Sequence, residues 1–189
     1  NHIKVEYAED SPNRGKLVLF KAGDTEPLVL GEAFSCVILA IRIQYNCYPL
    51  DEAGNTVKEK ILKTDLFERF QDEVKLYEGG ILIEKSKGIN HFIKDRFPEA
   101  KYREVLFVQY EGETYLLAIK GASLGNWFTF KKSFAGRVPF AFTTNISLTK
   151  AKRGSVTFWP ISFAKGDDLP KEAYQENLKK SFGVARSIE

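Results

Sequence analysis

An alternation of apolar and polar residues across residues 34–48 constrains the fold of this chain more than any other feature. Val37 and Leu39 fall on one face of an extended backbone, and the opposite face becomes polar at Arg42 and Gln44. A period of two residues is typical of a β-strand. The pattern therefore predicts a long strand that is buried on both faces at its start and on one face towards its end.

Shorter strand patterns, separated by turn signals, fill most of the remaining chain. The clearest hairpin joins residues 102–110 to residues 114–120 through the turn Glu111-Gly112-Glu113. Further strands are expected at residues 17–21, 28–30, 81–85, 140–149 and 155–163. Strands and helices do not alternate regularly, so the order predicts a mainly β, α+β fold with an antiparallel barrel or sandwich, and not a doubly wound parallel sheet.

Four segments have the spacing of apolar residues that is typical of short helices. They are residues 65–74, residues 89–97 before Pro98, residues 124–134, and a C-terminal helix over about residues 169–183 that Gly183 ends. The third segment has the widest apolar stripe, which consists of Leu124, Trp127, Phe128, Phe130 and Phe134. We expect these helices to elaborate a single domain over residues 1–189, whose core covers about residues 17–165.

The ends and the apolar runs bear on where the protein works. The longest apolar run, residues 37–41, is much shorter than the roughly 20 residues that cross a bilayer. The first residues, NHIKVEYAED, also lack the pattern of a signal peptide. We therefore expect an intracellular protein without membrane contact. Cys36 and Cys47 are interpreted as small apolar side chains, and no Cys/His spacing predicts a metal site.

The net charge of +3 conceals a strong polarity along the chain. Residues 114–166 are 53 residues without a single Asp or Glu, and their Lys and Arg give a charge of +8. The rest of the chain has a charge of −5. Because an ordinary protein surface mixes both signs, this segment predicts a basic surface for an anionic partner.

The same segment holds 10 of the 25 aromatic residues, including both tryptophans. This combination suits single-stranded DNA, with RNA as an alternative, because unpaired bases stack on aromatic rings at about 1–3 kcal/mol per base while Lys and Arg contact phosphates. The predicted nucleic-acid-binding residues are Lys120, Trp127, Lys131, Lys132, Arg137, Lys150, Lys152, Arg153 and Trp159. Roughly two-thirds of the aromatic residues are nevertheless expected in the core, since burial is the default for large apolar side chains. Trp159, next to a basic turn, is the best stacking candidate.

Three segments carry a resemblance to a known class of proteins. They read YREVLFVQY, YLLAIKGASLGNWFTFKKSF and FTTNISLTKAKRGSVTFWPISF. They resemble single-stranded DNA-binding proteins encoded by phages and related mobile elements. The resemblance implies an OB-like antiparallel barrel elaborated with helices, and a role in coating DNA during replication or recombination, with replication or recombination proteins as partners and oligomers as one arrangement. Many such proteins end in an acidic, aromatic tail that recruits partners, whereas this chain ends GVARSIE.

Two other classes of function stay open. One is an interaction module whose basic, aromatic surface docks an acidic protein partner. The other is a metal-dependent nuclease in which Asp65 and Glu73 hold Mg²⁺ and Lys75 orients water, although charged residues at such positions are more often the solvated face of a helix. Because no P-loop, zinc-protease or serine-hydrolase motif is present, we expect no enzymatic activity, no cofactor and no resident metal.

Overall fold

The computed structural model of the chain describes residues 1–87 and 97–186. Strands hold 48% of these described residues and helices 18%, which confirms the predicted mainly β class with a few helices. The residues form two compact units by their internal contacts: unit 1 holds Asn1–Ile41 and Leu106–Glu189, and unit 2 holds Arg42–Val105. A unit that is compact by its internal contacts need not fold by itself. The single domain that the sequence predicts therefore stays a prediction.

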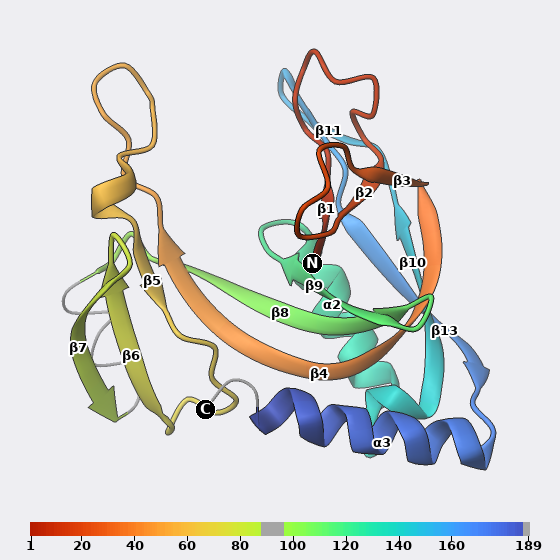
Figure 1. The fold of residues 1–189 in the computed structure, drawn as a ribbon. Coiled ribbons are helices and arrows are strands. Elements are labelled where there is room, and N and C mark those ends of the chain that lie inside the picture. Colours follow the sequence, from red (N-terminus) through yellow and green to blue (C-terminus); the bar gives the residue numbers. More distant parts are fainter. Residues whose placement is uncertain (88–96, 187–189) are drawn as a thin grey trace. The chain divides into compact units, whose positions relative to one another are not determined.

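Unit 1 contains most of the strands and both long helices (Figure 1). Its strands are β1 (His2–Val5), β2 (Leu17–Phe20), β3 (Leu28–Gly31), β9 (Glu113–Ile119), β10 (Phe142–Leu148), β11 (Ala151–Arg153), β12 (Val156–Phe158) and β13 (Ile161–Asp168). Its helices are α2 (Ser123–Ser133), the short 3₁₀ turn η2 (Pro139–Ala141) and α3 (Lys171–Arg186). Two long strands, β4 (Ala33–Cys47) and β8 (Lys101–Tyr110), continue from unit 1 into unit 2.

The strand order in unit 1 is β3-β2-β1-β9-β8-β4, and β10 joins β4 on one side and β13 on the other. The predicted strands at residues 17–21, 28–30, 34–48, 102–110 and 114–120 are all present. The expected barrel is not present, because the sheet does not close on itself. Among the pairings of the described residues, β3 bonds only to β2 and β13 only to β10, so no pair of strands completes a ring.

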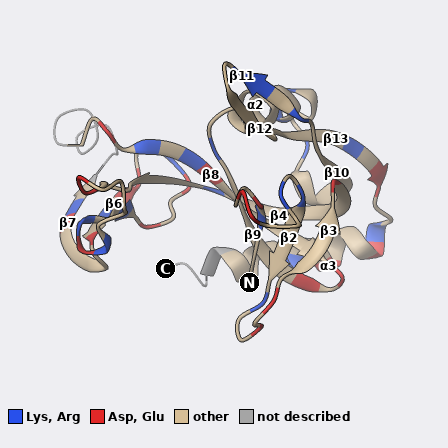
Figure 2. Cartoon of the chain, turned by 90° about the horizontal axis from the view of Figure 1, so that it is seen from above, with Lys and Arg blue, Asp and Glu red and all other residues tan. Residues whose placement is uncertain are grey.

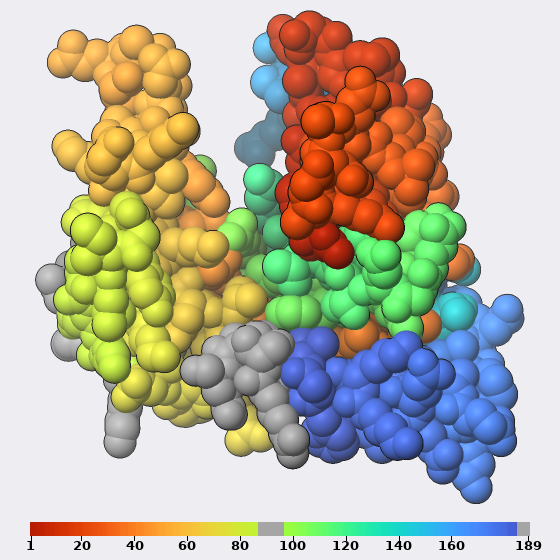
Figure 3. Space-filling model, in the orientation of Figure 1, coloured from red at the N-terminus to blue at the C-terminus, as the bar shows by residue number. Residues whose placement is uncertain are grey.

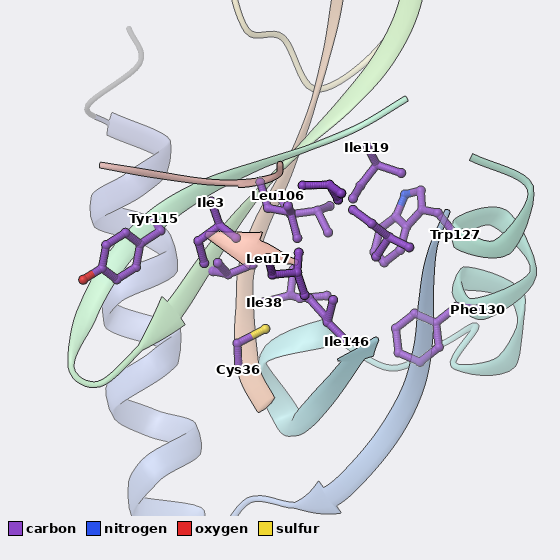
Figure 4. Close-up of a cluster of buried hydrophobic side chains, with 14 of the residues drawn as sticks. Ile3, Leu17, Cys36, Ile38, Leu106, Tyr115, Ile119, Trp127, Phe130 and Ile146 are labelled. Atoms are coloured by element: carbon purple, nitrogen blue, oxygen red, sulfur yellow. The ribbon is translucent and has the colours of Figure 1, made fainter. Parts of the chain in front are cut away.

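The core of unit 1 lies between the sheet and α2 (Figure 4). The predicted stripe on this helix is confirmed in part: Trp127, Phe130 and Phe134 are buried, whereas Leu124 is half-buried and Phe128 is 38% exposed. The buried Ser123 hydroxyl at the start of the helix accepts the backbone N–H of Ile161 in β13, at 2.9 Å. Gly136, at a φ of 84°, reverses the chain soon after the helix ends. Burial of aromatic side chains against the sheet thus holds α2 in place.

The C-terminal helix forms as predicted, with a different end. It runs on to Arg186, because Gly183 stays helical instead of reversing the chain. Tyr174 packs against Phe140 with ring centroids 5.6 Å apart, whereas Phe182 is 61% exposed. Within residues 1–87 and 97–186, no helix combines the length and the apolar character that crossing a membrane requires.

Unit 2 adds three strands to the shared pair. They are β5 (Leu62–Thr64), β6 (Glu73–Glu78) and β7 (Ile81–Lys87), in the order β8-β4-β5-β6-β7, with a 3₁₀ turn η1 (Lys58–Lys60) before β5. The prediction of a helix over residues 65–74 is wrong. Phe67 pairs with Ile43 through two backbone hydrogen bonds of 2.7 and 3.1 Å, and the Asp72 carboxylate accepts the Arg69 N–H in a tight turn. The helix expected over residues 89–97 lies outside the described residues except for Phe97.

The polar half of β4 is buried, although the sequence predicted an exposed face. Arg42, Gln44 and Asn46 are each less than 10% exposed. Gln44 donates from Nε2 to the carbonyl of Thr64 at 2.7 Å and accepts from Arg103 Nε at 2.9 Å. Hydrogen bonds of this kind offset the cost of burying polar side chains. The alternation of apolar and polar residues along one strand does not reveal such bonds.

Candidate nucleic-acid interface

The structure distributes the predicted basic residues over separate elements of unit 1. They are Lys120, Lys131 and Lys132 before and on α2, Arg137 after it, and Lys150, Lys152 and Arg153 on or beside β11. Figure 2 shows the basic residues of β11 in blue. The acid-free segment is continuous in sequence, but its basic residues lie on different elements and form several separate groups.

Trp127 is the clearest correction to the predicted site. Its side chain is 0% exposed, and its ring centroid lies 5.9 Å from that of Phe130 and 5.0 Å from that of Phe163. A ring without exposed surface cannot stack on a base while the core stays closed. The prediction that Trp127 binds nucleic acid is therefore wrong, because the apolar stripe of an amphipathic helix packs inwards.

Arg137 has a carboxylate partner that the residue count did not reveal. Its Nη2 atom lies 2.7 Å from Asp168 Oδ1, and Lys165 Nζ lies 2.8 Å from the same oxygen. The hydrogen bond from Lys165 has the larger effect in lowering the pKa of the Asp168 carboxyl, and the hydrogen bond from Arg137 has the next largest. These two cations share an acid that is the second residue after the acid-free segment, so Arg137 is a weaker candidate for phosphate than the other predicted basic residues.

The lysines near α2 form a second basic group with an aromatic neighbour. Lys131 is half-buried, and its Nζ lies 4.8 Å from the ring centroid of Phe128, which is 38% exposed. Lys120 and Lys132 are exposed. A cation held over an aromatic face is partly satisfied there, so this group offers phosphate contacts mainly through Lys120 and Lys132.

The hairpin of β11 and β12 brings Lys150 and Lys152 to the side of Trp159. The strand pairing continues beyond β11, where the N–H of Thr149 donates to the carbonyl of Pro160 at 3.2 Å. This register places Lys150 opposite Trp159. Because alternate residues of a strand share a face, Lys152 lies on that same face. Two of the three hairpin cations therefore flank the tryptophan.

Trp159 packs against the segment that follows β1. Its ring lies 6.2 Å from that of Tyr7, whose hydroxyl donates to the Trp159 carbonyl at 3.4 Å. The Arg14 guanidinium lies 5.6 Å from the indole centroid. A Cβ placed on Gly15 would lie 2.5 Å from Trp159 Cε2, so only a glycine permits this approach. Figures 1 and 3 show the two segments side by side.

These contacts change which ring is available to a base. Trp159 is half-buried, whereas Tyr7 is 47% exposed. Burial raises the pKa of the Tyr7 hydroxyl further above its ordinary value. Because a tyrosine hydroxyl is neutral near pH 7 in any case, it does not repel phosphate. We call the surface formed by Tyr7, Arg14, Lys150, Lys152 and Trp159, together with Arg153 at the tip of the same hairpin, the hairpin surface. Its exposed ring is Tyr7, and Trp159 supports it.

Tyr7 and Arg14 were absent from the predicted site. The hydrogen bond that joins Tyr7 to Trp159 spans 152 positions in the sequence. Both residues lie outside the acid-free segment, in a part of the chain with Glu6, Glu9 and Asp10. In the sequence, only the turn-forming residues around Asn13 and Gly15 indicate that the chain reverses direction between Tyr7 and residue 17.

Gly15→Ala is expected to lower the free energy of unfolding by about 1–3 kcal/mol more than Gly23→Ala does. Both glycines have positive φ, 76° and 96°, so both variants share the backbone strain. Only at Gly15 does the new Cβ meet Trp159, since nothing lies within 4 Å at Gly23. Urea unfolding followed by circular dichroism measures the difference. Equal losses would show that packing of Trp159 on Gly15 contributes nothing to stability.

The alternative nuclease residues lie on neighbouring elements of unit 2. Asp65 Oδ1 accepts the backbone N–H of Lys75 at 3.1 Å, and burial is the main cause that raises the pKa of the Asp65 carboxyl. Asp65 lines a pocket of about 630 Å³, whereas Glu73 and Lys75 do not line it. Across residues 1–87 and 97–186, no three His, Cys, Asp or Glu side chains cluster as metal ligands do.

Similarity to a protein of known function would be independent evidence for the function of this chain. The resemblance to single-stranded DNA-binding proteins covers about residues 17–165 and depends on loose residue patterns. Comparison with protein-family models, with curated proteins and with solved structures finds no match to this chain.

Proposed function

We propose that this protein binds single-stranded nucleic acid, with DNA as its main partner, through the hairpin surface. One observation carries the proposal: an exposed tyrosine, Tyr7, lies against Trp159 and beside a hairpin with Lys150, Lys152 and Arg153. A base needs an exposed ring and its phosphates need cations nearby. The hairpin surface supplies both from two segments of unit 1.

The three hairpin cations are exposed and therefore free to rotate towards a flexible phosphate chain. Arg14 is a further cation at the same place, although it lies 3.5 Å from the exposed Glu9 carboxylate. An ion pair between exposed groups contributes little, so a phosphate competes with Glu9 at small cost. Contacts to phosphate and to the face of any base carry no sequence information, so we propose binding without sequence preference.

The biological role follows from that chemistry. A protein that covers single strands without reading them serves intermediates of replication or recombination, and we propose such a role here, with proteins of those processes as further partners. The proposal includes no catalytic step and no cofactor. The basic group near α2 is a second contact for a longer strand.

A salt titration tests the proposal directly. Fluorescence anisotropy of a labelled poly-dT oligonucleotide should rise on addition of the protein, and log K should fall with log salt by about 0.7 for each phosphate neutralised. A duplex of the same length is the control and should bind more weakly, because its bases offer no free faces. No binding to poly-dT at low salt would contradict the proposal and favour the acidic protein partner.

The same mixture with Mg²⁺ separates binding from cleavage. We expect the oligonucleotide to stay intact on a denaturing gel after prolonged incubation. Degradation that Asp65→Asn removes would contradict a pure binding function and point to the nuclease residues.

A further inference from the structure

Unit 2 contains a pocket that the proposed function does not use. Its volume of about 630 Å³ lies within the range of about 300–1,000 Å³ that is typical of small-molecule sites. Strands β4, β5 and β6, the turn η1 and the turn between β6 and β7 all contribute to its wall. Its lining residues fall within Arg42–Val105, so the pocket belongs to one unit.

The register of β5 determines which side chains face this pocket. Lys63 lies opposite Asn46 on β4 and opposite Tyr77 on β6, and directly opposite residues of antiparallel strands share a face. Asp65 follows Lys63 by two residues and therefore lies on the same face. Leu76, the neighbour of Tyr77 on β6, faces the other way and is buried in the core of unit 2. The pocket thus lies on the polar face of this sheet.

Two backbone contacts hold the rim of the pocket in place. The N–H of Gly79 donates to the carbonyl of Ile61 at 2.9 Å. A Cβ placed on Gly79 would lie 2.7 Å from the carbonyl oxygen of Glu59, so the turn between β6 and β7 packs directly on η1. Because this backbone is already held without a ligand, binding there costs little ordering of the protein.

Two lysines of the pocket are free to bind an anion. Lys58 and Lys63 are exposed, and neither forms an ion pair with a described carboxylate. Asp65 is the one carboxylate among the lining residues, so the cations outnumber it two to one. Lysine ammonium groups commonly bind phosphate. The pocket therefore offers positive charge to an anionic group.

Two other groups in the pocket keep unused hydrogen-bonding capacity. Gln44 is 3% exposed, and its Nε2 donates one hydrogen to the carbonyl of Thr64 at 2.7 Å. An amide nitrogen carries a second hydrogen, and none of the described residues accepts it. Asp65 Oδ1 accepts the N–H of Lys75 at 3.1 Å, whereas no described residue donates to Oδ2. Because buried polar groups are normally satisfied, these two favour a ligand that supplies both an acceptor and a donor.

Apolar and aromatic side chains also line the pocket. Ile61, Leu66 and Tyr77 are half-buried there. A planar ring stacks on tyrosine and covers aliphatic groups. A sugar phosphate would leave this surface uncovered, and a lipid would leave the free groups of Gln44 and Asp65 without partners. The combination favours a ligand that carries a flat heterocycle and an anionic group together.

We propose that this pocket binds a nucleoside monophosphate. The phosphate contacts Lys58 and Lys63, and the base covers Tyr77. The edge of the base, which carries donors and acceptors side by side, bonds to Gln44 and Asp65. The site shares no residue with the hairpin surface, so it is independent of the proposed function.

Calorimetric titrations of the full chain with AMP, adenosine and ribose 5-phosphate test the proposal. AMP should bind at least about tenfold more tightly than either half, because only AMP reaches both the lysines and the base-edge groups. Replacing Lys58 and Lys63 together by Gln should weaken AMP binding about tenfold and leave adenosine binding unchanged. Asp65→Asn should weaken AMP and adenosine by the same factor and leave ribose 5-phosphate unchanged, because the amide keeps an oxygen for Lys75 and turns its NH₂ group towards the base.

Lys60→Gln combined with Lys85→Gln is the matched control. Both lysines are exposed and neither lines the pocket, so the same charge is removed and AMP binding should not change. Circular dichroism checks that all variants are folded. Absence of AMP binding, AMP binding no tighter than that of adenosine, or an equal loss of affinity in the control would overturn the proposal.

Competition separates this site from the hairpin surface. Poly-dT should not displace AMP, and replacing Lys150, Lys152 and Arg153 by Gln should leave AMP binding unchanged. Displacement of AMP by poly-dT would overturn the assignment of a separate site. A protein that binds AMP but not poly-dT would contradict the proposed function alone, so the two proposals fail in different ways.

Discussion

Trp127→Ala is expected to lower the free energy of unfolding by about 3–5 kcal/mol. The indole is 0% exposed and contacts Phe130 and Phe163, so its removal leaves a cavity between α2 and the sheet. Proteins of this size are stable by about 5–15 kcal/mol, so the variant loses a large part of its stability. Urea unfolding monitored by far-ultraviolet circular dichroism measures the loss without relying on tryptophan fluorescence.

Phe128→Ala is the matched control, because Phe128 follows Trp127 on the same helix and is 38% exposed. Its loss should stay within about 1 kcal/mol. Comparable losses for the two variants would contradict the assignment of Trp127 to the core. Folded Trp127→Ala protein should bind poly-dT as the wild type does, since the ring has no exposed surface for a base.

Replacing Lys150, Lys152 and Arg153 together by Gln is expected to weaken poly-dT binding more than any other change of three charges. Each cation that contacts a phosphate contributes about 0.7 to the slope of log K against log salt, so the slope should fall by about 2. The three side chains are exposed, so the fold should persist. Anisotropy titrations at several salt concentrations give both the affinity and the slope.

A second triple variant controls for net charge. Lys171, Lys179 and Lys180 lie on α3, which lies away from β11 within unit 1 in Figures 1 and 2. Their replacement by Gln removes the same charge and should leave the slope nearly unchanged. If both triple variants lose affinity equally, the net charge controls binding and the hairpin surface is not the site.

Sequence patterns predicted the elements that local residues determine. The hairpin of β8 and β9, the long strand β4 and the helix α2 all form within a residue or two of the expected positions. In β9 and α2 the period of the apolar residues matches the face that is buried, and the turn Glu111-Gly112 has positive φ at both residues. In β4 the period predicts the strand, although its polar face is buried as well. Local pattern and tertiary packing agree there, so either one leads to the same structure.

Residues 65–74 show why a helical period can mislead. Phe67 and Val74 satisfy helical spacing, yet both are buried in extended or turn conformation. The bridge from Phe67 to Ile43 joins residues 24 positions apart in sequence, and β6 gains a full ladder with β7. Long-range backbone pairing outweighs the weak helical preference of such a short segment.

The sequence by itself determined the mainly β class, the apolar stripe of α2 and the concentration of positive charge in residues 114–166. Only the tertiary structure decided which of those residues reach a surface together. It buried Trp127, joined Arg137 and Lys165 to Asp168, and brought Tyr7 and Arg14 to Trp159. The physical reason is that periodicity and composition report the preferences of neighbouring residues, whereas burial, ion pairs and ring contacts depend on which distant segments pack against each other.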